Sequence, residues 1–118
     1  MNNEFGEYIR KLRNERNLTL RQLAEQIGIS SYYLSYLETG KKTNPDIKII
    51  SNLFTALKMD KTEMELFLDY HAKANGCVSY DIVDFIMENE MVRADIRSAR
   101  DEPSSSPNWD DFICKISK

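Results

Sequence analysis

The chain has 118 residues, of which 42% are hydrophobic and 30% charged, with a formal net charge of -3 at pH 7. This length supports one modest core with a smaller helical continuation, and only 4 glycines and 3 prolines argue against a large all-β domain. Cys77 and Cys114 make no disulfide framework, and neither has a metal-ligand spacing with His71. We expect reduced thiols, no metal and no cofactor.

Charge is distributed unevenly along the chain. Residues 1–60 have a formal charge of +2 and residues 61–118 a formal charge of -5. Because charges act on phosphate only within about a Debye length of ~8–10 Å, the acidic average excludes nonspecific coating of nucleic acid but not a local contact. The N-terminal segment has no basic start followed by an apolar stretch, and no segment contains the ~20 apolar residues that cross a bilayer. We therefore expect a cytoplasmic protein without membrane contact.

Helical periodicity begins near the N-terminus. Apolar residues at i, i+3, i+4 and i+7 predict a helix over residues 4–16, with Phe5, Tyr8, Ile9 and Leu12 buried and with Glu7, Arg10 and Lys11 on the opposite face. Thr19 then predicts the N-cap of a second helix, with Gln22 as its capping-box partner and Gly28 at its end.

A third helix is expected after a single connecting residue, Ile29. Ser30 predicts its N-cap, Gly40 its end, and Leu34 and Leu37 its buried side. The remaining face presents Ser31, Tyr32, Ser35 and Tyr36. Since so short a link forces the two helices to cross, the pair has the geometry of a helix-turn-helix, whose second helix enters the DNA major groove.

Two further helices complete the first domain, residues 1–75. Thr43 or Asn44 is expected to cap the fourth, with Pro45 in its first turn. Its predicted buried stripe is Ile47, Ile50, Leu53, Phe54 and Leu57. The fifth is expected to begin at Asp60 and to end before Asn75-Gly76, burying Met64, Leu66, Phe67 and Tyr70.

Residues 76–118 are expected to form a small helical region. Ser79 predicts the cap of a helix that buries Ile82, Phe85 and Ile86, and a further short helix is indicated by Val92, Ile96 and Ala99. Composition predicts a linker at residues 101–107. The tail beyond it has an apolar face of Trp109, Phe112, Ile113 and Ile116, which must dock on residues 77–100 or on a second subunit or partner.

Residues 5–57 resemble the Cro/CI-type helix-turn-helix of the XRE family of prokaryotic and phage regulators. The residues that carry the resemblance are Leu23-Ala24-Glu25, Gly28, Ser30, Leu34, Leu37, Glu38-x-Gly40 and Asn44-Pro45. Ala24, for example, must be small because the two helices nearly touch there. The resemblance implies an all-α fold, in which a five-helix, lambda repressor-like DNA-binding domain precedes the small helical region.

The resemblance also implies roles for individual residues. Base edges would be contacted by Ser31, Tyr32, Ser35 and Tyr36, and the sugar-phosphate backbone by Tyr33, Thr39, Lys41, Lys42 and Thr43. Arg13 and Glu38 match a structural ion pair between the first helix and the third. The family often has a phosphate-binding glutamine where this chain has Leu20, so we expect backbone N–H groups, with Arg21 and Gln22, to replace that contact.

The same residues bear on two other functions, an enzyme and a protein-binding module. An enzyme is not expected, because no nucleophile or carboxylate lies at a spacing from His71 that would indicate a catalytic site. A solvated helix face explains Asp81, Asp84, Glu88 and Glu90 better than a metal site does. Tyr32, Tyr33 and Tyr36 suit a protein-binding module, such as an antitoxin-like or phage-encoded inhibitor, but the neighbouring Lys41-Lys42 favours DNA.

The sequence thus predicts a sequence-specific regulator of transcription that binds double-stranded DNA. A repressor is expected to act as a homodimer on a palindromic operator, because one recognition helix reads few base pairs. The acidic region from Lys61 onward is the expected site of the dimer interface or of contact with a protein or peptide effector.

Overall fold

The computed structural model describes residues 3–101, which form seven α-helices and no strand. The all-α prediction is confirmed. Two compact units divide the chain, with the boundary between Ser79 and Tyr80. The helices are α1 (Glu4–Glu15), α2 (Leu20–Ile27), α3 (Ser31–Thr39), α4 (Ile47–Ala56), α5 (Lys61–Asn75), α6 (Tyr80–Glu88) and α7 (Glu90–Asp101). The predicted linker, beyond Asp101, and the apolar tail with Trp109 lie outside the described residues.

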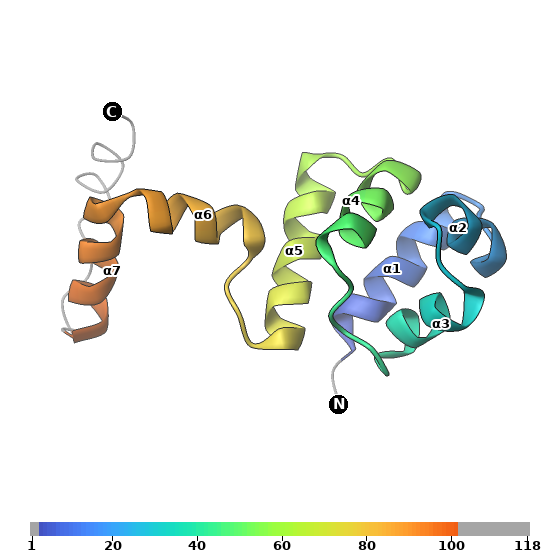
Figure 1. Ribbon diagram of the computed structural model, residues 1–118, viewed down its shortest axis with the longest axis horizontal. Coiled ribbons are helices and arrows are strands. Elements are labelled where there is room, and N and C mark those ends of the chain that lie inside the picture. Colours follow the sequence, from blue (N-terminus) through green and yellow to red (C-terminus); the bar gives the residue numbers. More distant parts are fainter. Residues whose placement is uncertain (1–2, 102–118) are drawn as a thin grey trace. The chain divides into compact units, whose positions relative to one another are not determined.

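The first unit has one core that all five of its helices share. Helix α1 packs against α3 and α5, while α2 packs against α3 and α4 (Figure 1). The largest fully buried apolar side chains are Phe5, Ile9, Leu12, Leu23, Leu34, Leu37, Leu53, Leu57 and Phe67. Every helix from α1 to α5 contributes to this set, so the core fixes α2 and α3 relative to the rest of the unit.

The first three helices follow the sequence prediction closely. The Thr19 side chain accepts a hydrogen bond from the Gln22 N–H at 3.1 Å, and the Gln22 side chain accepts one from the Thr19 N–H at 2.9 Å. The predicted capping box is therefore confirmed. Ser30 caps α3 by accepting from the Tyr33 N–H at 3.0 Å. The predicted glycine ends are confirmed as well, since Gly28 and Gly40 both adopt positive φ.

Helix α4 begins later than predicted. Its N-cap is Asp46, whose carboxylate accepts from the Ile49 N–H at 2.9 Å, so the expected cap at Thr43 or Asn44 is wrong. The side chains of Thr43 and Asn44 form hydrogen bonds to α5 instead. The position of Pro45 in the first turn is also wrong, because Pro45 precedes the helix. Ile47, predicted to be buried, is the first residue of the helix and is 70% exposed.

Helix α5 begins at the predicted place, and its buried face agrees with the prediction only in part, because Phe67 is fully buried as predicted. Asp60 is its N-cap, with Glu63 as capping-box partner, and Asn75 is its last residue. Leu66, predicted to be buried, is 38% exposed, whereas Leu68 and His71 are buried. Leu66, Phe67 and Leu68 are consecutive apolar residues, so their pattern did not define which side faces the core.

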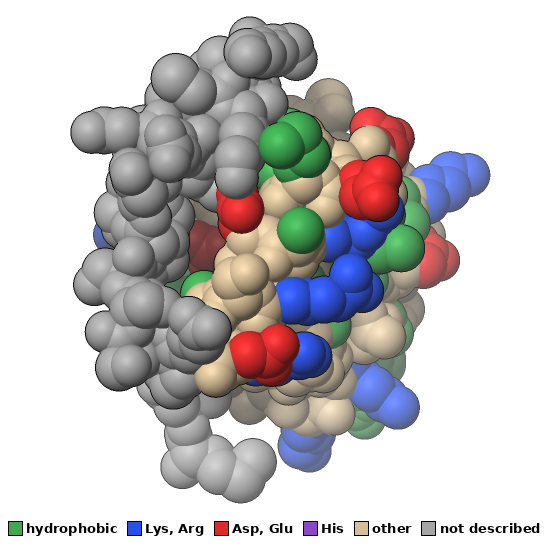
Figure 2. All heavy atoms as spheres, turned by 90° about the vertical axis from the view of Figure 1, so that its left-hand side faces the viewer, with side chains coloured by type: hydrophobic (Ala, Val, Ile, Leu, Met, Phe, Trp, Pro, Cys, Tyr) green, Lys and Arg blue, Asp and Glu red, His purple; other side chains and the backbone are tan. Residues whose placement is uncertain are grey.

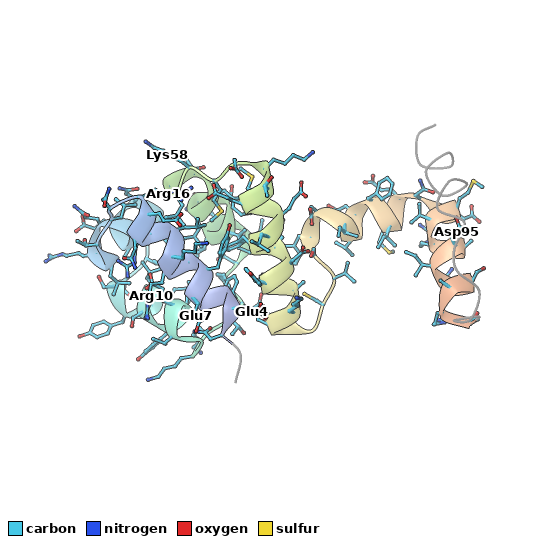
Figure 3. All side chains as sticks on the ribbon, turned by 180° about the vertical axis from the view of Figure 1, so that it is seen from behind. Glu4, Glu7, Arg10, Arg16, Lys58 and Asp95 are labelled. Atoms are coloured by element: carbon cyan, nitrogen blue, oxygen red, sulfur yellow. The ribbon has the colours of Figure 1, made fainter. Side chains whose placement is uncertain are left out.

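Arg16 ties three elements together at the C-terminal end of α1. Its Nε donates to the Leu57 carbonyl at 2.7 Å, and its Nη2 donates to both Glu63 carboxylate oxygens at 2.8 and 2.9 Å. Arg16 also lines a small pocket together with Lys58, and Figure 3 labels both residues at this end of the unit. The Asp60 N–H and the Arg16 guanidinium lower the pKa of Glu63 below its usual 4.5. This junction fixes α5 against α1.

In the second unit, α6 packs against α7. Asn89 accepts from the Val92 N–H at 3.2 Å, and the Arg93 guanidinium donates to the Ile86 and Met87 carbonyls at the end of α6. Val92 is buried, as expected. The predicted burial of Ile82, Phe85 and Ile96 is wrong, because each is at least two-fifths exposed, and Ile86 is only partly buried.

The surface of the second unit is both charged and apolar. On the side where α7 lies in Figure 1, basic side chains form a band between acidic ones (Figure 2). Val78, just before the unit, and Met87 and Met91 within it are at least half exposed. Within residues 3–101, no helix has both the length and the apolar character that a membrane span requires.

Candidate nucleic-acid interface

The turn between α2 and α3 sets the direction of α3. Gly28 has φ of 77° and ψ of 31°, a left-handed conformation that favours glycine. The Ile29 N–H donates to the Ala24 carbonyl at 3.0 Å, which closes the turn. Ala24 is 1% exposed, as expected for a small residue where two helices meet. These contacts hold α3 across α2 in a defined orientation.

One side of α3 faces solvent and the other faces the core. Leu34, Leu37 and Glu38 are buried, whereas Tyr32 is 79% exposed and Tyr36 is 39% exposed. Ser31 and Ser35 are partly exposed on the same side. The structure therefore brings the four residues predicted to contact bases onto one accessible face. This face offers two serine hydroxyls and two phenol rings, with no charge of its own.

A basic segment directly follows this face. Lys41 and Lys42 are both exposed. The Lys41 ammonium lies 5.3 Å from the centre of the Tyr36 ring, within the range of a cation–π contact. The Lys42 N–H donates to the Tyr36 carbonyl at 3.1 Å. Both lysines are thus placed beside the tyrosine face rather than elsewhere on the unit.

The other residues predicted to contact the DNA backbone lie in differing environments. Arg21 is 85% exposed and lies 3.6 Å from Glu25, so this loose ion pair leaves the guanidinium accessible. The side-chain Oε1 of Gln22 already accepts the Thr19 N–H in the capping box. Thr39 is exposed and donates to the Tyr36 carbonyl at 3.4 Å, and Tyr33 is partly exposed. Thr43 is partly buried, and its hydroxyl donates to Asn75 of α5.

The predicted ion pair of Arg13 and Glu38 is present, and a second arginine, Arg10, also binds Glu38. Arg13 donates to the two Glu38 carboxylate oxygens, from Nε at 2.8 Å and from Nη2 at 3.0 Å. Arg10, which sequence reasoning placed on the exposed face of α1, donates to the same carboxylate at 3.2 Å. Glu38 is 2% exposed, so two guanidinium groups neutralise a buried charge at the end of α3.

Two further residues position the end of α3 and were missed in the sequence. The Asn3 side chain donates to the Glu38 carbonyl at 2.9 Å, which satisfies a carbonyl at the C-terminal end of the helix. A Cβ added at Gly6 would lie less than 3.0 Å from the carbonyl oxygens of Leu37 and Glu38. Gly6 therefore allows α1 to approach the backbone of α3. Neither residue has a local sequence signal, because both act over more than thirty positions.

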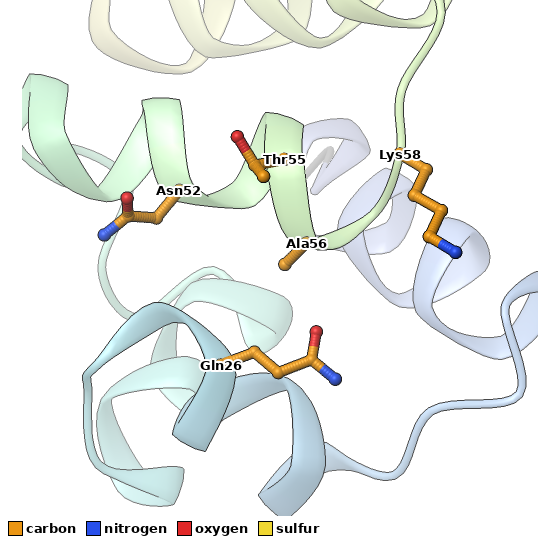
Figure 4. Close-up of a pocket in the computed structure, with 5 residues that line it drawn as sticks. All are labelled: Gln26, Asn52, Thr55, Ala56 and Lys58. Atoms are coloured by element: carbon orange, nitrogen blue, oxygen red, sulfur yellow. The ribbon is translucent and has the colours of Figure 1, made fainter.

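An open pocket lies between α2 and α4, and no residue of the tyrosine face lines it. Gln26, Asn52, Thr55, Ala56 and Lys58 line it, and Figure 4 shows the Gln26 side chain across from α4. None of the residues predicted to contact DNA lines this pocket. The four residues predicted to contact bases therefore lie on the exposed face of α3 and not in this pocket.

Comparison with known proteins agrees with this geometry. A helix-turn-helix domain family matches residues 4–67, more than half of the 118-residue chain. The HTH-type transcriptional repressor RghR of Bacillus subtilis (strain 168) is 46% identical over 55 residues, which are 47% of this chain and 41% of that protein. The HTH-type transcriptional regulator SlrR of the same organism is 34% identical over 60 residues, covering 51% of this chain and 40% of SlrR.

A third relative is covered more completely. The HTH-type transcriptional regulator SinR of Bacillus licheniformis is 32% identical over 74 residues, covering 55% of this chain and 67% of that protein. By contrast, the match to RghR spans only about two-fifths of the length of RghR. The residues that match the helix-turn-helix domain family, 4–67, lie within the first unit. The chain belongs to the helix-turn-helix domain family, as the resemblance to XRE regulators predicted.

Proposed function

We propose that this protein is a DNA-binding regulator of transcription whose α3 helix reads the major groove of a specific operator. The observation that carries the proposal is the exposed face of α3, which presents Tyr32 and Tyr36 with two exposed lysines directly after the helix. Its relatives are named transcriptional regulators, and one of them a repressor. Repression is therefore the sign of regulation that we propose.

The chemistry of this face defines how it would read DNA. It lacks the Arg, Asn and Gln side chains that make bidentate contacts to guanine or adenine. Tyrosine rings pack against thymine methyl groups, and the hydroxyls of Ser31 and Ser35 offer single hydrogen bonds. Lys41 and Lys42 would contact phosphates, fixing the register of the helix without reading sequence. Each base contact on this face is modest, so specificity requires several of them together.

A homodimer on a palindromic operator supplies that number of contacts. Two recognition helices about 34 Å apart would enter successive turns of the major groove on one side of the duplex. We place the dimer interface in the second unit, where Ile82, Phe85 and Ile96 are each at least two-fifths exposed. A single mass corresponding to the monomer in light scattering at micromolar concentration, with and without operator DNA, would refute this dimer.

The alternative function is protein recognition through the same tyrosines. The 79% exposure of Tyr32 is the observation that favours it, since exposed tyrosines are common in interface hot spots. The two functions differ in electrostatics. Binding to DNA releases counterions in proportion to the number of phosphates contacted, whereas a contact made by neutral tyrosines does not depend strongly on salt.

Fluorescence anisotropy over a salt series separates these alternatives. The double variant Lys41→Ala/Lys42→Ala should weaken binding to all duplexes and reduce the slope of log K against log[salt] by up to about 2, at ~0.9 per phosphate contact. The control is Lys61→Ala/Lys73→Ala, which removes the same charge from exposed positions on α5. A salt slope that is equal in all three proteins would contradict the proposed docking.

A second pair of variants tests the base contacts. Tyr32→Ala/Tyr36→Ala should reduce the preference for operator over scrambled DNA while leaving the salt slope nearly unchanged, because the rings carry no charge. If the tyrosine variant leaves DNA discrimination intact, α3 does not read bases with this face. Protein recognition would then account for the tyrosines.

A further inference from the structure

The two lysines lie in a segment that has no regular structure of its own. Residues 40–46 connect α3 to α4 without helical or strand hydrogen bonding. An exposed segment of this kind loses conformational entropy when it becomes ordered on a partner. A phosphate contact made by Lys41 and Lys42 would therefore be weak unless the protein itself orders the segment before binding.

Asn75, at the end of α5, is bonded to this segment across 32 positions of sequence. Its Nδ2 donates to the Thr43 carbonyl at 2.6 Å, and its Oδ1 accepts from the Thr43 hydroxyl at 3.1 Å. The same Nδ2 also donates to the His71 carbonyl at 2.9 Å, within α5. Three hydrogen bonds therefore fix the Asn75 amide, which in turn holds both the backbone and the side chain of Thr43.

The next residues of the segment also lie against α5. The Nε2 of His71 lies 3.3 Å from the side-chain Oδ1 of Asn44, and Pro45 is buried. At its other end the segment is held by the hydrogen bond from the Lys42 N–H to the Tyr36 carbonyl. Residues 40–44 therefore form a short arch whose ends are fixed by α3 and α5. Lys41 and Lys42 are part of this arch, and their side chains remain exposed.

We propose that Asn75 is a positioning residue for DNA binding, which holds the arch of residues 40–44 so that Lys41 and Lys42 face phosphates without a further ordering step. This inference rests on the proposed function, because it assigns a role in DNA contact to the arch. Asn75 itself touches no DNA in the proposed docking. It acts through Thr43, so α5, which lies outside the helix-turn-helix, supports the DNA-binding surface without contacting DNA.

The Asn75→Ala variant tests this role directly. Loss of the amide frees the Thr43 carbonyl and hydroxyl, so the arch should become mobile in the protein without DNA. Each backbone residue that must then be ordered on binding should weaken affinity about tenfold. Because the arch no longer holds the two lysines in position before binding, their combined contribution to DNA affinity should fall. The salt slope should then decrease toward that of Lys41→Ala/Lys42→Ala.

Ser79→Ala is the matched control. Ser79 is buried, and its hydroxyl donates to the Asp69 carboxylate at 2.9 Å and to the Leu68 carbonyl at 3.4 Å. The substitution therefore removes side-chain hydrogen bonds to α5 without touching the arch. Melting temperatures of both variants show whether they lose comparable stability. A purely structural role for Asn75 predicts that the two variants bind DNA alike once both are folded at the assay temperature.

Two measurements are made on wild type and both variants, using the full chain. The first is amide hydrogen exchange at Lys42, whose N–H is bonded to the Tyr36 carbonyl; without DNA this exchange should accelerate in Asn75→Ala but not in Ser79→Ala. The second is anisotropy with an operator duplex, including a double-mutant cycle between Asn75→Ala and Lys41→Ala/Lys42→Ala. The lysine substitutions should cost less affinity in the Asn75→Ala background than in wild type, and a Ser79→Ala background should leave their cost unchanged.

The outcomes separate this inference from the proposed function. If wild type binds operator DNA but Asn75→Ala shows additive losses and an unchanged salt slope, the positioning role is wrong while DNA binding stands. If exchange in the arch is unchanged in Asn75→Ala, Asn75 does not order it, whatever the DNA result. If wild type binds no duplex, the proposed function fails and the positioning role fails with it, even when the exchange data show an ordered arch.

Discussion

Removal of Arg13 should destabilise the first unit more than any exposed charge substitution. The Glu38 carboxylate is 2% exposed and accepts two hydrogen bonds from Arg13, whose own side chain is 14% exposed. In Arg13→Met the methionine side chain takes the place of the aliphatic part of the arginine, but the Glu38 carboxylate loses its bidentate partner. Arg10 remains as a second partner at 3.2 Å, but its side chain is 51% exposed and shared with solvent.

The expected magnitude follows from the cost of leaving a buried charge without its partner. Breaking such a pair typically costs about 3–5 kcal/mol, and the remaining bond from Arg10 places Arg13→Met at about 3 kcal/mol. For a domain of this size that corresponds to a decrease in melting temperature of about 12–24 °C. The double variant Arg13→Met/Glu38→Met should lose less than the single variant, because no carboxylate remains to be desolvated.

Urea and thermal unfolding followed by circular dichroism measure these differences. Arg21→Met is the control, since its pair with Glu25 is exposed on both sides and should contribute less than about 1 kcal/mol. The reasoning is refuted if Arg13→Met stays within about 1 kcal/mol of wild type, the level of an exposed pair. It is equally refuted if the double variant is less stable than Arg13→Met.

Three further predictions concern stability. Gly6→Ala should lower the free energy of unfolding of the first unit by about 1–3 kcal/mol in chemical unfolding, because the added Cβ would meet backbone carbonyls of α3 that cannot move independently. If the variant were as stable as wild type, α1 would have to shift freely to make room. Burial lowers the pKa of His71 below 6.5, so the unfolded chain binds its proton first and stability should fall as pH drops below that value; an equally steep loss in His71→Gln would exclude His71 as the cause. The Asp60 N–H and the Arg16 guanidinium lower the pKa of Glu63, so the stability that Glu63 contributes is present above pH 4.5 and is lost as pH falls through the folded-state pKa. Glu63→Gln should therefore flatten the acid limb of the stability profile, and an unchanged limb would contradict this assignment.

The parts of the fold that the sequence predicted correctly are those determined by local chemistry. Thr19 with Gln22, Ser30, and the two glycines at the ends of α2 and α3 act within one helical turn, so their residue types define the helix bounds. The exposed face of α3 followed from the same bounds. Once the helix begins at Ser31, its periodicity decides which residues face the core.

The errors arose where distant residues compete with local signals. Asn44 is an ordinary N-cap candidate, but its side chain pairs with His71, and Asp46 caps α4 instead. Ile82 and its neighbours have the spacing of a buried stripe, yet periodicity does not show whether a partner surface is present. Likewise, the role of Asn75 depends on a contact with Thr43 across 32 positions, which no local pattern indicates.

Binding to DNA from upstream of the protein's own gene tests the central proposal most directly. Anisotropy should be measured with that duplex and with a scrambled duplex of the same composition, at several salt concentrations. The proposal predicts that upstream DNA binds at least about 10³-fold more tightly than scrambled DNA near physiological salt. Equal affinities for the two duplexes would contradict sequence-specific regulation, and no binding to either at moderate salt would contradict a DNA-binding function altogether.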